Sequence, residues 1–141
     1  MMNITISIPT KAQIISGGFE VHVAATGASW SKSQLGDYAD KKGVYIHHSR
    51  GKLLYIGKST SGQFGTFGER LRREFQTLAA ANSTLHQLLA GQKQKIQTYL
   101  IDLEDLDMMI DSGSIALTAE RKALIMEQVL IGIYQPPGNI V

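Results

Sequence analysis

Regular alternation of apolar and polar residues predicts several short β-strands. Residues 4–8 and 19–23 alternate in this way, which is the period of a half-buried strand. Denser apolar runs at 44–47 and 53–56 flank a turn sequence at 49–51, where a glycine accepts positive φ. The two runs therefore predict an antiparallel hairpin.

A longer spacing predicts helices in the second half of the chain. Apolar residues recur every three or four positions over 67–81, and the leucines of 85–89 predict another helix that stops near Gly91. Residues 96–103 predict a third strand of the central sheet. A long helix is expected over 118–134, because the two prolines that follow cannot continue it.

These elements predict one α+β domain, for which a chain of 141 residues is long enough. We divide it into an N-terminal extension, residues 1–42, and a main domain, residues 43–141. The extension is expected to hold a β-hairpin and an irregular segment. Its role is open: an extra hairpin, a DNA contact and an oligomer contact all fit the sequence.

The amino-acid composition excludes several kinds of site and partner. The chain has no cysteine, which excludes disulfides, thiolate zinc sites and cysteine nucleophiles and fits a reducing, cytoplasmic setting. No apolar run is long enough to span a bilayer, and no secretory signal is visible, so no membrane partner is expected. The net charge is only +2, so any surface that binds phosphate must be local.

Two tyrosines mark the predicted hairpin as a candidate site. If a three-residue loop joins the strands, Tyr45 stands directly opposite Tyr55, and both phenols share one face. Val44, Ile46, Leu54 and Ile56 then share the other, apolar face. A two-residue turn would place Tyr45 opposite Ile56 and mix the faces, so we favour the longer loop. Taken alone, a packed aromatic pair is the commoner explanation of such tyrosines.

Gly43-Val44-Tyr45 and Tyr55-Ile56-Gly57, separated by nine residues, resemble the two-part signature of the GIY-YIG nucleases. Further elements of that family follow in order as far as Asn139, so the resemblance covers about 97 of 141 residues. It implies the GIY-YIG fold, a central three-stranded antiparallel sheet flanked by helices. Here that sheet would carry an extra N-terminal β segment.

Basic residues follow the hairpin, as in this family. Lys58 comes directly after Gly57, and Arg70 resembles the family's helix arginine, which contacts the scissile phosphate. Fixed cations stabilise the charge that builds on phosphate during hydrolysis, and arginine can bind it bidentately. The residues predicted to contact DNA are Arg50, Lys52, Lys58, Arg70, Arg72 and Arg73. For Arg72 and Arg73, a solvated helix face is the commoner alternative.

The sequence departs from the family at two places. The loop between Lys58 and Arg70 is longer than in compact members, so a neighbouring residue could take the arginine's role. Glu74 stands where many members carry a histidine. His47, His48 and His86 do not match that position, and we interpret them as surface or strand residues. Gly57-Lys58-Ser59 also resembles the end of a P-loop, but the spacing is wrong and its preceding residues form a strand.

Glu127 is the candidate metal ligand. It lies in a helix that is apolar nearly all round, where a carboxylate is costly unless a cation compensates. A core salt bridge or a position at the helix edge is the alternative. By resemblance, Glu127 holds one Mg²⁺, which Mn²⁺ can replace, and Asn139 supports the site twelve positions later. The predicted catalytic set is Tyr45, Tyr55, Lys58, Arg70, Glu127 and Asn139.

The expected function is Mg²⁺-dependent endonuclease cleavage of DNA by water that a tyrosine or the metal activates. We assign proton acceptance to Tyr45 and a hydrogen bond with phosphate or water to Tyr55. One site per chain implies either a nickase or a homo-oligomer. Two alternatives remain: a non-catalytic DNA-binding module that retains the fold, and a structural or protein-interaction domain.

Overall fold

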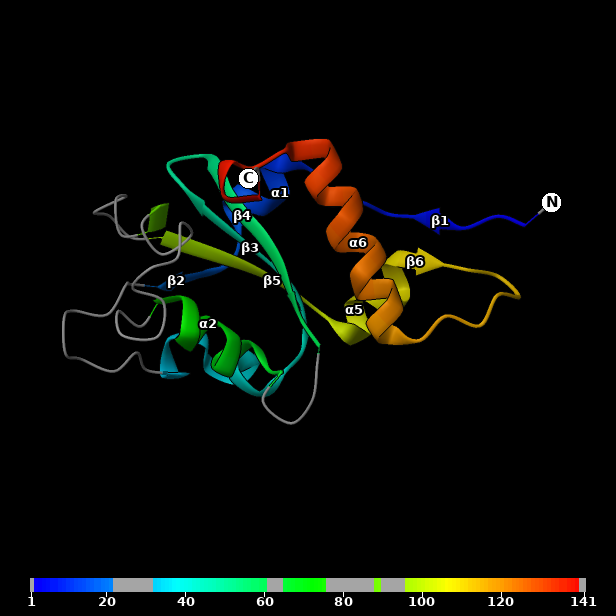
Figure 1. The fold of residues 1–141 in the computed structure, drawn as a ribbon, viewed down its shortest axis with the longest axis horizontal. Coiled ribbons are helices and arrows are strands. Elements are labelled where there is room, and N and C mark those ends of the chain that lie inside the picture. The colour runs from blue at the N-terminus through cyan, green and yellow to red at the C-terminus, as the bar shows by residue number, and fades with distance from the viewer. Residues whose placement is uncertain (1, 22–31, 61–64, 76–87, 90–95, 140–141) are drawn as a thin grey trace.

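The computed structural model describes residues 2–21, 32–60, 65–75, 88–89 and 96–139 (Figure 1). Four antiparallel strands form the main sheet in the order β2-β5-β3-β4. Their bounds are Phe19–Val21 for β2, Gly43–Ser49 for β3, Lys52–Ser59 for β4 and Ile96–Asp102 for β5. The predicted α+β class is confirmed: β5, β3 and β4 form the expected three-stranded sheet, and β2 is the expected extra N-terminal β segment. In this sheet β4 is an edge strand.

The extra strand comes from the N-terminal extension. There, β1 (Thr5–Ile6) precedes α1 (Lys11–Ser16) and β2. The expected hairpin is wrong, because β1 pairs with the distant β6 (Ile110–Asp111) and β2 pairs with β5. Figure 1 shows β1 and β6 side by side, away from the main sheet. The division of the chain at residue 42 stays a prediction.

The long helix follows its sequence signals closely. Helix α6 spans Ala119–Tyr134, and the Thr118 side chain caps it by accepting from the Arg121 N–H. It ends at Gln135 with φ of 45°, just before the two prolines. Helix α5 (Leu103–Met109) was not expected, although Asp102 is an N-cap that accepts from the Asp105 N–H.

Two other segments agree with the predicted helices only in part. Helix α2 spans Phe67–Phe75, so the rest of the helix predicted to residue 81 lies outside the described residues. The same holds for most of the helix predicted over 85–89. Two 3₁₀ segments were not expected: η1 (Lys32–Asp40) before β3 and η2 (Pro137–Asn139) after α6. Within the part of the chain that is described, no helix has the length and apolar character needed to cross a bilayer.

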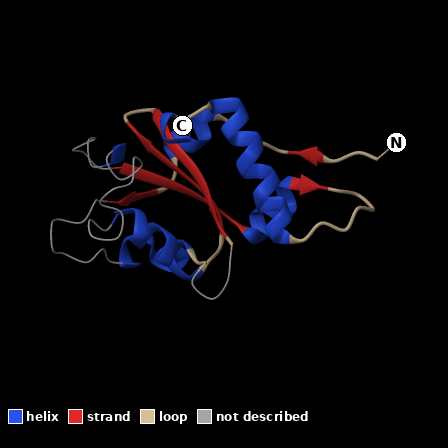
Figure 2. Ribbon diagram, viewed as in Figure 1, coloured by secondary structure: helices blue, strands red, loops and turns tan. Residues whose placement is uncertain are grey.

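The helices cover both faces of the sheet (Figure 2). On one face, Phe67, Leu71 and Phe75 of α2 are fully buried against a cluster that includes Tyr45 and Leu100. Their spacing of four residues makes one apolar stripe on the helix. On the other face, buried residues of α6 pack against Val44, Ile46 and Ile56. The core therefore consists of two apolar layers, one on each side of the sheet.

The hairpin turn is shorter than expected. Only Arg50 and Gly51 join β3 to β4, and both have positive φ, 54° and 77°, as a type I′ turn requires. Next to it the register shifts: His48 faces Leu53, whereas His47 faces Tyr55. Leu54 is thus an extra residue, a β-bulge, and it joins the α2 side of the core rather than the Ile56 side.

This bulge corrects the predicted pairing of the tyrosines. Tyr45 faces Gly57, so the expectation that it stands directly opposite Tyr55 is wrong. Both phenols nevertheless lie on one face as diagonal neighbours, because the bulge restores the alternation that a two-residue turn alone would have reversed.

His48 makes the fold sensitive to acid. Its side chain is buried, and ring Nε2 lies 3.2 Å from the Gly17 carbonyl oxygen. Burial lowers the pKa of His48 below 6.5, although the Gly17 hydrogen bond opposes this. As the pH falls below the ordinary pKa of histidine, the unfolded chain therefore binds more protons than the folded chain. The free energy of unfolding decreases over that range. We expect Tm to fall between about pH 8 and about pH 5, and to fall less for His48→Gln. Equal falls in both proteins would contradict this.

Candidate active site

Gly57 makes room for the paired tyrosines. The rings of Tyr45 and Tyr55 are 6.1 Å apart at 41°, and Tyr45 is only 2% exposed whereas Tyr55 is half-buried. A Cβ at Gly57 would lie 2.5 Å from Cζ of Tyr45 and 2.9 Å from Cε2 of Tyr55. No side chain fits there without moving a phenol. The last glycine of the hairpin motif is thus required by the tyrosines that surround it.

The side chain of Asn139 binds the backbone of β4, the strand that carries Tyr55. Its Oδ1 accepts from the Ile56 N–H at 2.8 Å, and its Nδ2 donates to the Ile56 carbonyl at 2.8 Å. At the edge of the sheet these backbone groups lack a neighbouring strand, and the amide takes its place. A Cβ at Gly138 would lie 2.6 Å from the Leu54 carbonyl, so the close approach also needs a glycine. Asn139 therefore holds the backbone between Tyr55 and Gly57.

Removing this amide is expected to loosen the hairpin. Asn139→Ala would leave both Ile56 groups to water, which should lower the free energy of unfolding by about 1–3 kcal/mol. Asn139→Asp keeps the acceptor but places a carboxylate against the Ile56 carbonyl, so it should also be destabilised. Urea unfolding measures both. Unfolding free energies equal to that of the wild type would mean that this amide does not hold β4.

Glu127 lies at the border of the buried surface of α6. It is half-buried, and its Oε1 accepts from Nε2 of Gln128 at 3.2 Å. The helix is not apolar all round in its packing, because Leu124 and Ile133 are 42% and 53% exposed. Of the two alternatives considered for Glu127, the position at the helix edge agrees with this burial. Lys122 is a buried charged residue of α6, and its Nζ lies 2.8 Å from Oδ1 of the exposed Asp107.

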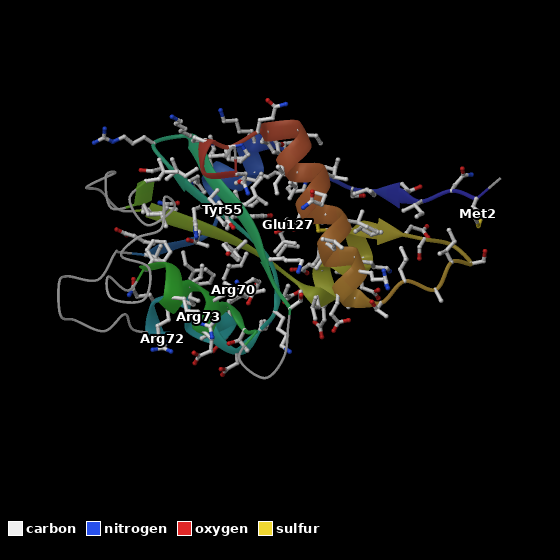
Figure 3. All side chains as sticks on the ribbon, in the orientation of Figure 1. Met2, Tyr55, Arg70, Arg72, Arg73 and Glu127 are labelled. Atoms are coloured by element: carbon white, nitrogen blue, oxygen red, sulfur yellow. The ribbon has the colours of Figure 1, made fainter. Side chains whose placement is uncertain are left out.

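Groups on opposite faces of the sheet can meet at the edge strand. Lys58 pairs with Val44 and so belongs to the face that α6 covers, whereas Tyr55 belongs to the face that α2 covers. Arg70 is half-buried beside the apolar stripe of α2, next to Leu71. Figure 3 shows Tyr55, Arg70 and Glu127 around the centre of the molecule, on β4, α2 and α6.

The remaining predicted DNA contacts lie farther out. Arg72 and Arg73 are exposed on α2, and Arg72 bonds to Glu69 at 3.4 Å (Figure 3). Arg50 and Lys52 are exposed at the hairpin turn, roughly 20 Å along β4 from Lys58. They could therefore contact only phosphates well removed from a bond held at Lys58.

The carboxylate ligands available among the described residues suit a single hard cation. Among the described residues, no three His, Cys, Asp or Glu side chains gather as a preformed metal cage. Mg²⁺ characteristically keeps several waters and binds through one or two carboxylates plus substrate phosphate. Glu127, which forms no ion pair with any described residue, fits that donor set.

His47 is the residue that sequence reasoning missed. It lies in a strand as expected, but it is fully buried rather than at the surface, and its ring lies beside those of Tyr45 and Tyr55. His48 is buried too, and His86 lies outside the described residues. The available signal was its position two residues after Tyr45, which places it on the tyrosine face.

No family model matches the sequence, and no curated protein matches it. Among solved structures, the chain is similar to the GIY-YIG N-terminal endonuclease domain of UvrC from Thermotoga maritima. One tyrosine-to-phenylalanine mutant of that domain, bound to its catalytic divalent cation, is 25% identical over 72% of this chain and 86% of that chain, with TM-score 0.44. The domain bound to magnesium is 24% identical over 72% and 85%, with TM-score 0.41.

Proposed function

We propose that this chain is a DNA endonuclease of the GIY-YIG type that hydrolyses phosphodiester bonds with one Mg²⁺ per site. The observation that carries the proposal is the double hydrogen bond from Asn139 to Ile56. These two bonds join Ile56, in the second part of the signature, to Asn139, 83 residues later. They fix the strand that carries Tyr55. A packed aromatic pair alone would not need this closure.

Arg70 and Lys58 would bind the scissile phosphate from the two sides of β4. Negative charge grows on the phosphate oxygens as water attacks, and preorganised cations stabilise that charge more than the charge of the substrate. Arg70 keeps its proton at all relevant pH values and can bind two oxygens at once. Lys58 would act as a point charge.

Tyr45 would take the proton of the attacking water, and Tyr55, the more exposed phenol, would hydrogen-bond the phosphate. An unperturbed tyrosine has a pKa of about 10, which leaves only about 0.1% phenolate at neutral pH. The positive charge of Arg70, on the helix that covers the tyrosine face, would favour the phenolate.

Glu127 would hold the metal ion at the edge of β4. Mg²⁺, or Mn²⁺ in its place, supplies positive charge against the leaving oxygen when it is bound. With one ion, Arg70 and Lys58 provide the charge that a second metal gives in two-metal nucleases. A chain with one site would nick DNA, or cut both strands as a homo-oligomer. We assign it to the cytoplasm, because a chain without cysteine forms no disulfides and needs no oxidising compartment.

Plasmid cleavage tests the proposal. Supercoiled plasmid is incubated with the protein and Mg²⁺, with Mn²⁺, or with EDTA, and the products are resolved on a gel. Nicked or linear DNA only in the presence of metal is expected. If several plasmids and a single-stranded substrate stay intact with either metal, while salt-dependent binding persists, the chain is a DNA-binding module instead.

A further inference from the structure

His47 is a buried polar residue inside the tyrosine face. Its ring centre lies 5.1 Å from that of Tyr45 and 6.1 Å from that of Tyr55, nearly parallel to the latter at 26°. Phe75 of α2 meets it edge-on, 5.0 Å away at 81°. The imidazole is thus in contact range of both phenols and is closed in by α2.

Thr98 anchors this imidazole. Nδ1 of His47 lies 2.8 Å from Oγ1 of Thr98, and both residues are fully buried. Thr98 is the register partner of His47 in β5 and also faces Phe19 of β2, so it sits in the interior of the sheet. A hydrogen bond to so rigid a site fixes the orientation of the ring, which apolar packing alone would leave free to adjust.

An apolar side chain in place of His47 would fill the same space with a smaller desolvation cost. Burying an imidazole requires hydrogen bonds to compensate for the loss of water, whereas phenylalanine or leucine requires none. The surrounding residues are apolar on the α2 side, with Leu71 and Phe75 fully buried. The imidazole therefore occupies a position beside the two phenols that an apolar side chain could have filled.

We propose that His47, held by Thr98, is a positioning residue that sets the orientation of the Tyr45 and Tyr55 phenols. The inference rests on the proposed nuclease function, in which these phenols contact water and phosphate. Displacing a catalytic group by about 1 Å lowers the rate steeply, so an imidazole fixed beside both phenols has a direct effect on turnover. His47 itself need not touch the substrate.

Kinetics of variants test this assignment. Thr98→Val removes the hydroxyl with little change in volume, and His47→Phe keeps a ring without nitrogen. Each is expected to lower kcat by about tenfold to a hundredfold with the KM for DNA unchanged. Thr98→Ser, which keeps the hydroxyl, should retain wild-type kcat. The double variant should be no worse than either single one, because both remove the same interaction.

Two results would overturn the proposal. One is wild-type kcat in folded Thr98→Val, and the other is equal loss in Thr98→Ser, which would point to the methyl group and hence to packing. Thermal unfolding of each variant identifies any that fails to fold.

A readout independent of cleavage separates this proposal from the nuclease assignment. The five tyrosines are labelled as 3-fluorotyrosine, and the signals of Tyr45 and Tyr55 are assigned by phenylalanine substitution. Thr98→Val should shift or broaden these two ¹⁹F signals and leave that of Tyr134 in place. If cleavage is absent but these signals move, only the nuclease function fails. If wild type cuts and the signals do not move in Thr98→Val, the positioning role fails.

Discussion

Glu127→Ala is expected to abolish metal-dependent cleavage, lowering kcat by about a hundredfold or more. A metal ion supplies several kcal/mol of charge stabilisation in such reactions, and each 1.4 kcal/mol or so is a factor of ten in rate. Glu127 is the carboxylate of α6 that is half-buried and forms no ion pair with any described residue. Its loss should therefore remove the metal and, of the described contacts, only the exposed hydrogen bond from Gln128.

The same variant should not lose stability. A half-buried carboxylate without a cation is unfavourable, so alanine should give equal or higher Tm in EDTA. Mg²⁺ should raise the Tm of the wild type, because a ligand that binds only the folded state stabilises it, and should not raise that of Glu127→Ala. Calorimetric or fluorescence melting with and without Mg²⁺ measures this difference.

Glu120→Ala provides the matched control. Glu120 is exposed in the first turn of the same helix, so its removal changes the net charge equally without touching the edge of β4. It should cleave as the wild type does and keep the Mg²⁺-dependent rise in Tm. If Glu127→Ala cleaves like Glu120→Ala, the metal is held elsewhere and the assignment of Glu127 is wrong.

Local signals made much of this fold predictable. Helix α6 begins at a threonine cap and ends before two prolines, and both boundaries can be inferred from neighbouring residues alone. Strands β3 and β5 are apolar runs whose alternation places them in the sheet. The shared face of Tyr45 and Tyr55 was predicted from a three-residue loop that the structure does not have, and the bulge at Leu54 gives the same face by another route.

Features decided by tertiary contacts were not predictable from such signals. The bulge at Leu54 exists because this leucine packs toward α2 while Ile56 packs toward α6, a choice that depends on helices distant in sequence. The pairing of Thr5–Ile6 with Ile110–Asp111 joins segments with no local signal of each other. An alternating pattern fixes which residues share a face, but it does not name the partner strand.

The candidate site also combines features with a local sequence signal and features that depend on tertiary contacts. The residue types of the motif were evident in the sequence. The hydrogen bonds between Asn139 and Ile56 were not, because no sequence spacing predicts a contact across 83 residues. His47 was missed because histidine is usually found at the surface or half-buried. Only the packing of α2 reveals that this one is enclosed with the tyrosines.

Arg70→Ala is expected to lower kcat by about a hundredfold to a thousandfold, which is typical for loss of one group that stabilises transition-state charge. Arg70→Lys should recover only part of that loss, because an ammonium cannot bind two oxygens in a plane. Arg73 offers the comparison, since it is exposed on the same helix. Arg73→Ala should instead weaken DNA binding several-fold and reduce the salt slope by about one, with kcat nearly unchanged.

Single-turnover cleavage at saturating protein, together with binding at several salt concentrations, separates the two effects. A charge that only attracts DNA acts equally on substrate and transition state, so it changes KM and leaves kcat alone. A charge at the reacting phosphate acts mainly on kcat. If Arg70→Ala behaves like Arg73→Ala, the long loop before α2 has moved the catalytic arginine to another position, and Arg70 serves only to bind DNA.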